Sequence, residues 1–79
     1  MPNASLAQRV AGNVRAEMAR IGYSQSALAR KMNRTQQYVS RRVSGYVPFD
    51  VAELDEIAQI LGVPIESFFR EGPAVAVPA

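Results

Sequence analysis

Residues 36–41, QQYVSR, place two amide groups and a guanidinium group on one short stretch of chain. Gln37 and Arg41 are four residues apart, so they share one stripe if the segment is helical. A glutamine can pair with N6 and N7 of adenine, and an arginine with O6 and N7 of guanine. Each such pair contributes about 1–3 kcal/mol of discrimination between bases. We therefore assign the reading of base edges to Gln36, Gln37, Ser40 and Arg41.

The alternative is an ordinary solvated helix, because exposed glutamines on soluble helices are common. Two adjacent glutamines at the start of a helix, close to an arginine, favour the binding role over this alternative. Tyr38 stays open between two roles. Its ring can pack at the edge of the core, or the residue can contact a phosphate or a thymine methyl group.

The composition removes most routes to catalysis and metal binding. The 79 residues include no histidine and no cysteine, and Lys31 is the only lysine. Catalysis would need paired carboxylates, or a lysine or serine nucleophile. The carboxylates of residues 50–61 are expected mainly on the solvent side of their helix. We therefore expect no enzymatic activity, no cofactor, no metal and no small-molecule ligand.

Charge is divided unevenly along the chain. Residues 1–49 carry eight basic side chains and one acidic side chain, a net charge of +7. Residues 50–79 carry one basic and six acidic side chains, a net charge of −5. The first half therefore suits a polyanionic partner such as nucleic acid, and the alternative is a solvated surface that is merely lopsided.

Helices are expected to position these residues. The first follows a capping box at Ser5 and Gln8 and ends at Gly22. Its predicted buried face consists of Leu6, Val10, Val14, Met18 and Ile21. The second helix follows Ser24 and the third follows Thr35, each as N-cap. These two helices are expected to bury Leu28, Met32, Val39 and Val43.

Two further helices are expected in the acidic half. Asp50 and Glu53 form a second capping box, and Gly62 ends the helix that follows. Its apolar stripe consists of Val51, Leu54, Ile57, Ala58 and Leu61. Pro64 suits the first position of a short last helix. The prediction is an all-α, five-helix domain over residues 1–71, with 72–79, GPAVAVPA, as a flexible tail or the start of a linker.

The second and third helices form a recognisable pair. They are short, a tight turn joins them, and the small Ala29 allows a close crossing, which predicts a helix-turn-helix at residues 24–44. The stretch SQSALARKMNRTQQYVSRRVSG resembles the helix-turn-helix of lambda-type phage repressors and their bacterial relatives, the Cro/C1 or XRE class. VAELDEIAQILGVP is similar to the fourth helix of that class. The resemblance covers residues 5 to 69 and implies a lambda-repressor-like fold.

One departure from the class lies in the turn. The class usually has Gly-Val or Gly-Met there, and this chain has Asn33-Arg34. Asn33 can adopt the left-handed conformation of a glycine. Arg34 replaces an apolar side chain that normally packs inward, so it either extends along the surface or reaches a phosphate.

The resemblance implies a sequence-specific regulator of transcription. Proteins of this class read bases from the positions that match Gln36, Gln37 and Arg41, and contact a phosphate from the position of Gln25. The expected function is a repressor that occupies a palindromic operator on double-stranded DNA, in a phage immunity, Cro-like or bacterial role. The alternative is an antitoxin or another protein-interaction module on the same fold. The predicted phosphate contacts are Arg15, Ser24, Gln25, Arg34, Thr35, Tyr38, Arg42, Ser44 and Tyr46.

The adjacent Phe68 and Phe69 indicate how the domain could pair. One short helix cannot bury both rings against the same core, so one is expected in the core and the other at a homodimer interface. The alternative is a monomer in which the tail covers the second ring. No apolar run of about 18 residues and no signal-peptide pattern occurs, so we expect a cytoplasmic protein that does not enter a membrane.

Overall fold

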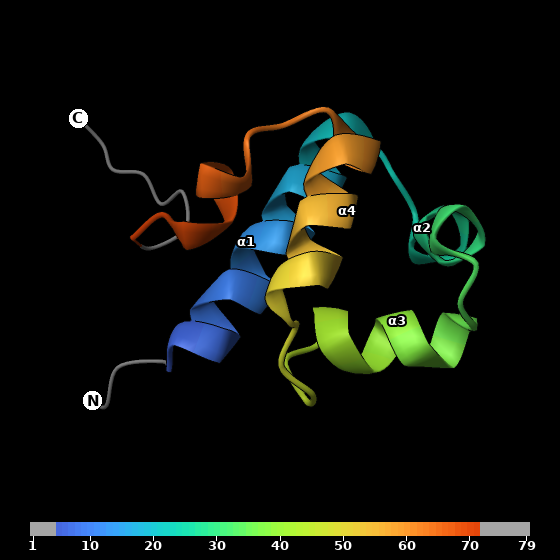
Figure 1. Ribbon diagram of the computed structural model, residues 1–79, viewed down its shortest axis with the longest axis horizontal. Coiled ribbons are helices and arrows are strands. Elements are labelled where there is room, and N and C mark those ends of the chain that lie inside the picture. The colour runs from blue at the N-terminus through green and yellow to red at the C-terminus, as the bar shows by residue number, and fades with distance from the viewer. Residues whose placement is uncertain (1–4, 72–79) are drawn as a thin grey trace.

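The computed structural model describes residues 5–71, which form four α-helices and one 3₁₀-helix (Figure 1). These are α1 (Leu6–Ile21), α2 (Gln25–Met32), α3 (Gln36–Val43), α4 (Val51–Leu61) and η1 (Ile65–Phe69). No strand occurs within residues 5–71. The all-α prediction is confirmed, and the predicted tail at 72–79 lies outside the described residues.

The fifth element differs from the prediction in its type. It is a 3₁₀-helix of five residues, with an i→i+3 bond from the Ser67 amide to the Pro64 carbonyl at 2.9 Å. The helix begins at Ile65, so Pro64 is its N-cap and not, as predicted, its first residue. A segment this short gains little from α-helical bonding, so the tighter turn is the expected solution.

Local capping sets the bounds of the four α-helices. Both predicted capping boxes are present, at Ser5 with Gln8 and at Asp50 with Glu53. The hydroxyl oxygens of Ser24 and Thr35 accept backbone N–H bonds at 3.0 Å and begin α2 and α3 as predicted. Because a cap satisfies amides that have no partner within the helix, each of these contacts fixes where a helix starts.

Asn33 makes the turn between α2 and α3. Its φ of 58° and ψ of 44° are left-handed, and it is the only non-glycine residue with a positive φ among the described residues. The Arg34 amide donates to the Ala29 carbonyl at 2.9 Å, and the Asn33 amide donates to the Arg30 carbonyl at 3.1 Å. This pair of bonds closes the helix in the same way as a C-terminal glycine does. The predicted conformation of Asn33 is confirmed.

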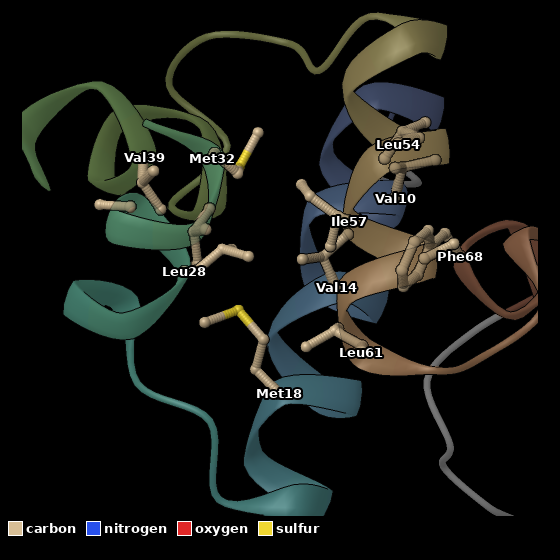
Figure 2. Close-up of a cluster of buried hydrophobic side chains, with 13 residues drawn as sticks. Val10, Val14, Met18, Leu28, Met32, Val39, Leu54, Ile57, Leu61 and Phe68 are labelled. Atoms are coloured by element: carbon tan, nitrogen blue, oxygen red, sulfur yellow. The ribbon is translucent and has the colours of Figure 1, made fainter. Parts of the chain in front are cut away.

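The helices pack around one apolar core (Figure 2). α1 and α4 run side by side through the domain, with η1 on one side of them and the α2–α3 pair on the other (Figure 1). α3 contributes only Val39 and Val43 to the core. The other members are Val10, Val14, Met18, Leu28, Ala29, Met32, Leu54, Ile57, Ala58, Leu61 and Phe68. The side of α3 opposite these two valines is therefore left free.

Three residues of the predicted apolar faces are not in the core. Leu6, Ile21 and Val51 are 54%, 44% and 72% exposed, so the prediction that they are buried is wrong. Leu6 and Ile21 are the first and last residues of α1, and Val51 is the first residue of α4. Helical spacing gives the direction of a side chain but does not show whether a neighbouring element extends far enough to cover it.

A buried polar contact fixes η1 on α1. The side-chain amide of Asn13 is buried and donates to the carbonyls of Phe68 and Arg70, both at 3.0 Å. The two bonds hold the chain so that Phe68 enters the core and Phe69 stays partly exposed. The prediction that the two phenylalanines face different surroundings is confirmed. Asn13 itself was not identified from the sequence.

The turn gives a test of the backbone at Asn33. We expect Asn33→Ala to lower the free energy of unfolding by about 1 kcal/mol, because an L-residue with a Cβ atom is strained in the left-handed region. Asn33→Gly is the matched control and should stay within about 0.5 kcal/mol of the wild type, since glycine adopts this conformation without strain. Urea unfolding measures both values. A loss of stability in the glycine variant as large as in the alanine variant would contradict this account.

Candidate nucleic-acid interface

The outward face of α3 carries the predicted base-reading residues. With 3.6 residues per turn, the buried Val39 and Val43 define the inner side of the helix. Gln37 and Arg41 lie on the opposite side, and Gln36 and Ser40 lie on one flank. All four side chains are exposed. The helix thus presents two amides, a hydroxyl and a guanidinium group to solvent on one continuous surface.

Gln36 is oriented by a contact from α2. The hydroxyl of Ser26 donates to Oε1 of Gln36 at 3.1 Å, which links the first turns of the two helices. The amide nitrogen of Gln36 keeps its two N–H donors for another partner. Ser26 was not among the predicted site residues, because only the packing of α2 against α3 brings it close.

The other flank of α3 faces α4 and is organised around Tyr38. The Tyr38 hydroxyl donates to the carboxylate of Glu53, and the guanidinium groups of Arg42 and Arg34 lie over its ring at 3.6 and 4.8 Å. The hydrogen bond to Glu53 raises the pKa of Tyr38 above its ordinary value, and burial and the charge of Glu53 act in the same direction. The two arginines oppose this shift. In this structure, the Tyr38 side chain therefore connects α3 to α4.

Glu53 is buried, with 6% of its surface exposed. The Arg42 Nε atom donates to this carboxylate at 3.3 Å, and the Asp50 amide donates to its Oε1 atom at 3.0 Å. The expectation that the carboxylates of α4 lie mainly on the solvent side is therefore wrong for Glu53. The local pattern identified its capping role, but its partners come from α3, 11 and 15 residues away.

A hydrogen bond from α1 holds the C-terminal end of α3. Nη1 of Arg15 donates to the Val43 carbonyl at 2.6 Å, which satisfies one of the carbonyls that a helix end leaves unpaired. The chain then turns through Gly45, whose φ is 89°, and the amide of Tyr46 donates to the Arg41 carbonyl at 2.9 Å. The exposed side chain of Tyr46 therefore stands beside the end of α3.

Other predicted contacts lie at the starts of α2 and α3. Gln25 is the first residue of α2, where the free N–H groups and the helix dipole favour an anion. The hydroxyls of Ser24 and Thr35 accept the capping bonds of their own helices. Arg34 is exposed in the turn between α2 and α3. The structure thus brings Gln25, Arg34 and the outer face of α3 to the α2–α3 side of the domain.

An apolar groove lies elsewhere, between the start of α1, the start of α4 and η1. Its volume is about 230 Å³, and it contains three partly exposed apolar side chains, those of Leu6, Val51 and Phe69. The remaining lining residues are Ala7, Val10, Phe49 and Leu54. Of the two candidate interface residues, Phe69 thus belongs to an apolar surface formed by three elements, while Phe68 is fully buried.

None of the helices between residues 5 and 71 is both long and apolar enough to cross a membrane. Within the same residues, no group of three or more metal-ligating side chains comes together.

Comparison with models of known protein families identifies a match. A family model described as helix-turn-helix matches residues 14–68, more than half of the chain. The matched region runs from the middle of α1 to Phe68 and includes α2, α3 and α4 entirely. No curated protein and no solved structure was found to match.

The raised pKa of Tyr38 gives a pH-dependent stability. The folded state keeps the phenolic proton at pH values where the unfolded chain has lost it. This stabilisation is complete below the ordinary tyrosine pKa of 10.0 and is lost as the pH rises through the folded-state value. Above pH 10, the free energy of unfolding should therefore fall more steeply for the wild type than for Tyr38→Phe. Urea unfolding at a series of pH values measures both slopes, and equal slopes would contradict the assignment.

Proposed function

Because the chain belongs to the Cro/C1-type helix-turn-helix family of DNA-binding regulators, we propose that it is a sequence-specific regulator of transcription. In this proposal, α3 enters the major groove of double-stranded DNA as the recognition helix. The observation that carries the proposal is the attachment of α3 through Val39 and Val43, which leaves its polar face free. The net charge of +7 on residues 1–49 supplies the attraction to the DNA backbone.

Base reading is assigned to the outer face of α3. Gln37 and Arg41 stand directly opposite the core, where a helix in the groove comes closest to the base edges. Gln36 and Ser40 lie on the adjoining flank, with Gln36 held by Ser26. An arginine suits guanine and a glutamine suits adenine, so a half-site containing both base types is expected.

Backbone contacts are assigned to residues around this face. Gln25 and Ser24 lie at the N-terminal end of α2, Arg34 and Thr35 lie in the turn, and Ser44 and Tyr46 follow α3. Such contacts set the register of the protein on DNA and carry no sequence information. Three other predicted contacts are occupied within the protein, because Arg15 binds the Val43 carbonyl, and Tyr38 and Arg42 bind Glu53.

Pairing of two copies is assigned to the apolar groove that contains Leu6, Val51 and Phe69. Two copies related by a two-fold axis would place two recognition helices on the half-sites of a palindrome, about one helical turn apart. Stable protein interfaces bury about 800 Å² on each partner, and a groove of about 230 Å³ admits only a few side chains. The homodimer is therefore expected to be weak in solution and to form on DNA. A dimer in this position represses by occupying the operator and excluding polymerase.

Base reading is tested by selecting preferred sequences from random DNA duplexes. Gln37→Ala and Arg41→Ala should each relax the preference at one base pair per half-site, at a cost of about 1–3 kcal/mol. Gln59→Ala and Arg30→Ala remove the same side-chain types from exposed positions on other helices, and they should select the wild-type sequence. If Gln37→Ala and Arg41→Ala also selected that sequence, α3 would not be the reading helix.

Pairing is tested with a charge in the apolar groove. Val51→Glu should leave binding to a single half-site unchanged and weaken binding to the palindrome by roughly 10-fold or more, because two linked half-site contacts reinforce each other. Ala52→Glu adds the same charge at the next position, outside the groove lining, and should keep the wild-type affinity for the palindrome. Gel-shift titrations on both duplexes measure this. Equal affinities for Val51→Glu and Ala52→Glu would place the dimer interface elsewhere.

A further inference from the structure

The flank of α3 that faces α4 holds two groups that commonly bind phosphates. The guanidinium of Arg42 and the hydroxyl of Tyr38 both donate to the carboxylate of Glu53. Arginine and tyrosine side chains are frequent donors to DNA phosphates. We propose that Glu53 acts as an internal substitute for a phosphate, which keeps Arg42 and Tyr38 off the DNA backbone and so lowers affinity for non-specific sequences. This inference rests on the proposed DNA-binding function.

The geometry around the carboxylate is that of a closed anion site. The Arg42 Nε atom lies 3.3 Å from Glu53, and the Asp50 amide lies 3.0 Å from its Oε1 atom. The Arg42 guanidinium also stacks 3.6 Å from the centre of the Tyr38 ring and donates to the Tyr38 carbonyl at 3.4 Å. Arg42 is therefore held by the carboxylate, the ring and the carbonyl together. A phosphate beside α3 would therefore have to compete with Glu53 for Arg42.

This ion pair is not the only attachment of α3. Val39 and Val43 already bury the inner side of α3, and Arg15 holds its last turn. A buried ion pair has a desolvation cost that often cancels its attraction, so it is a poor source of stability. A function in DNA binding gives a reason for the pair. The Glu53–Arg42 pair decides which positive charges of α3 remain available to phosphates.

Of the α3 arginines, Arg41 faces outward and is exposed, while Arg42 is neutralised on the flank. Non-specific affinity rises with the number of phosphates that a protein neutralises, whereas base reading depends on Gln37 and Arg41. Removing one phosphate contact therefore lowers non-specific binding and leaves base discrimination unchanged. The result is a larger ratio of specific to non-specific affinity.

The test compares Glu53→Gln with the wild type. Glutamine keeps an acceptor for the Asp50 amide, so the cap of α4 is preserved, while the negative charge is lost. The expected result is tighter binding to a random-sequence duplex at 0.1 M salt, by roughly 3- to 10-fold, with a salt slope steeper by about 0.9. The sequence chosen from random duplexes should not change. Glu56→Gln, at an exposed position of α4, removes the same formal charge and is the matched control.

Two further variants connect the effect to Arg42. Adding Arg42→Gln to Glu53→Gln should return the salt slope to the wild-type value. Arg42→Gln alone should leave the wild-type slope unchanged, and this keeps the proposal testable if Glu53→Gln does not fold in a thermal melt. If the slope of Arg42→Gln alone fell by about 0.9, Arg42 would already contact a phosphate, and the proposal would be overturned.

Two other outcomes would also overturn the proposal. Equal gains in Glu53→Gln and Glu56→Gln would mean that only net charge matters. Weaker binding by a folded Glu53→Gln variant would mean that Glu53 organises α3 for binding. Failure of the proposed function looks different, since the wild type would then bind no duplex even at 0.05 M salt. If the wild type binds DNA and the variants do not behave as expected, only the inference about Glu53 fails.

Discussion

The structure depends on holding an eight-residue helix firmly through one narrow face. An isolated helix as short as α3 is not stable in water, so its order has to come from tertiary contacts. Those contacts use one side of the helix, because the opposite side carries only polar and charged residues, which are exposed. Val39 and Val43 meet this constraint, since burying each valine contributes about 1.5–3 kcal/mol. The rest of the domain can be understood as support for these two contacts.

Polar contacts from three other helices complete the support of α3. Arg15 of α1 holds its C-terminal end, Ser26 of α2 reaches its first residue, and Glu53 of α4 binds its flank. The same contacts also decide which polar groups of α3 remain exposed to solvent and which are paired within the protein.

Electrostatics follow the same division within the domain. The basic half of the chain carries α3, while the acidic half supplies α4 and one buried carboxylate, Glu53, that reaches across to α3. The remaining exposed acidic residues of α4 have no such contact with α3. Under the proposed function, the protein has to be attracted to DNA of any sequence and still dissociate from most of it. A mixture of free and neutralised arginines on α3 is one way to meet both requirements.

The sequence by itself determined the features that depend on neighbours within about four residues. The caps at Ser5, Ser24, Thr35 and Asp50, the left-handed turn at Asn33 and the inward stripe of α3 were all predicted correctly, because each is set by local bonding or by helical period. The division of Phe68 and Phe69 between core and surface was also predicted, since adjacent side chains point in different directions.

Only the tertiary structure decided how far each face is covered and which polar groups meet. The exposure of Leu6, Ile21 and Val51 depends on where neighbouring helices end, which no local pattern contains. The partners of Asn13 lie 55 and 57 residues away, and Glu53 binds Tyr38 and Arg42 through the packing of α3 on α4. The sequence does not distinguish a buried polar residue from a solvated one of the same type. A polar group is stable in the interior only when other groups satisfy its hydrogen bonds, and folding decides whether distant residues supply them.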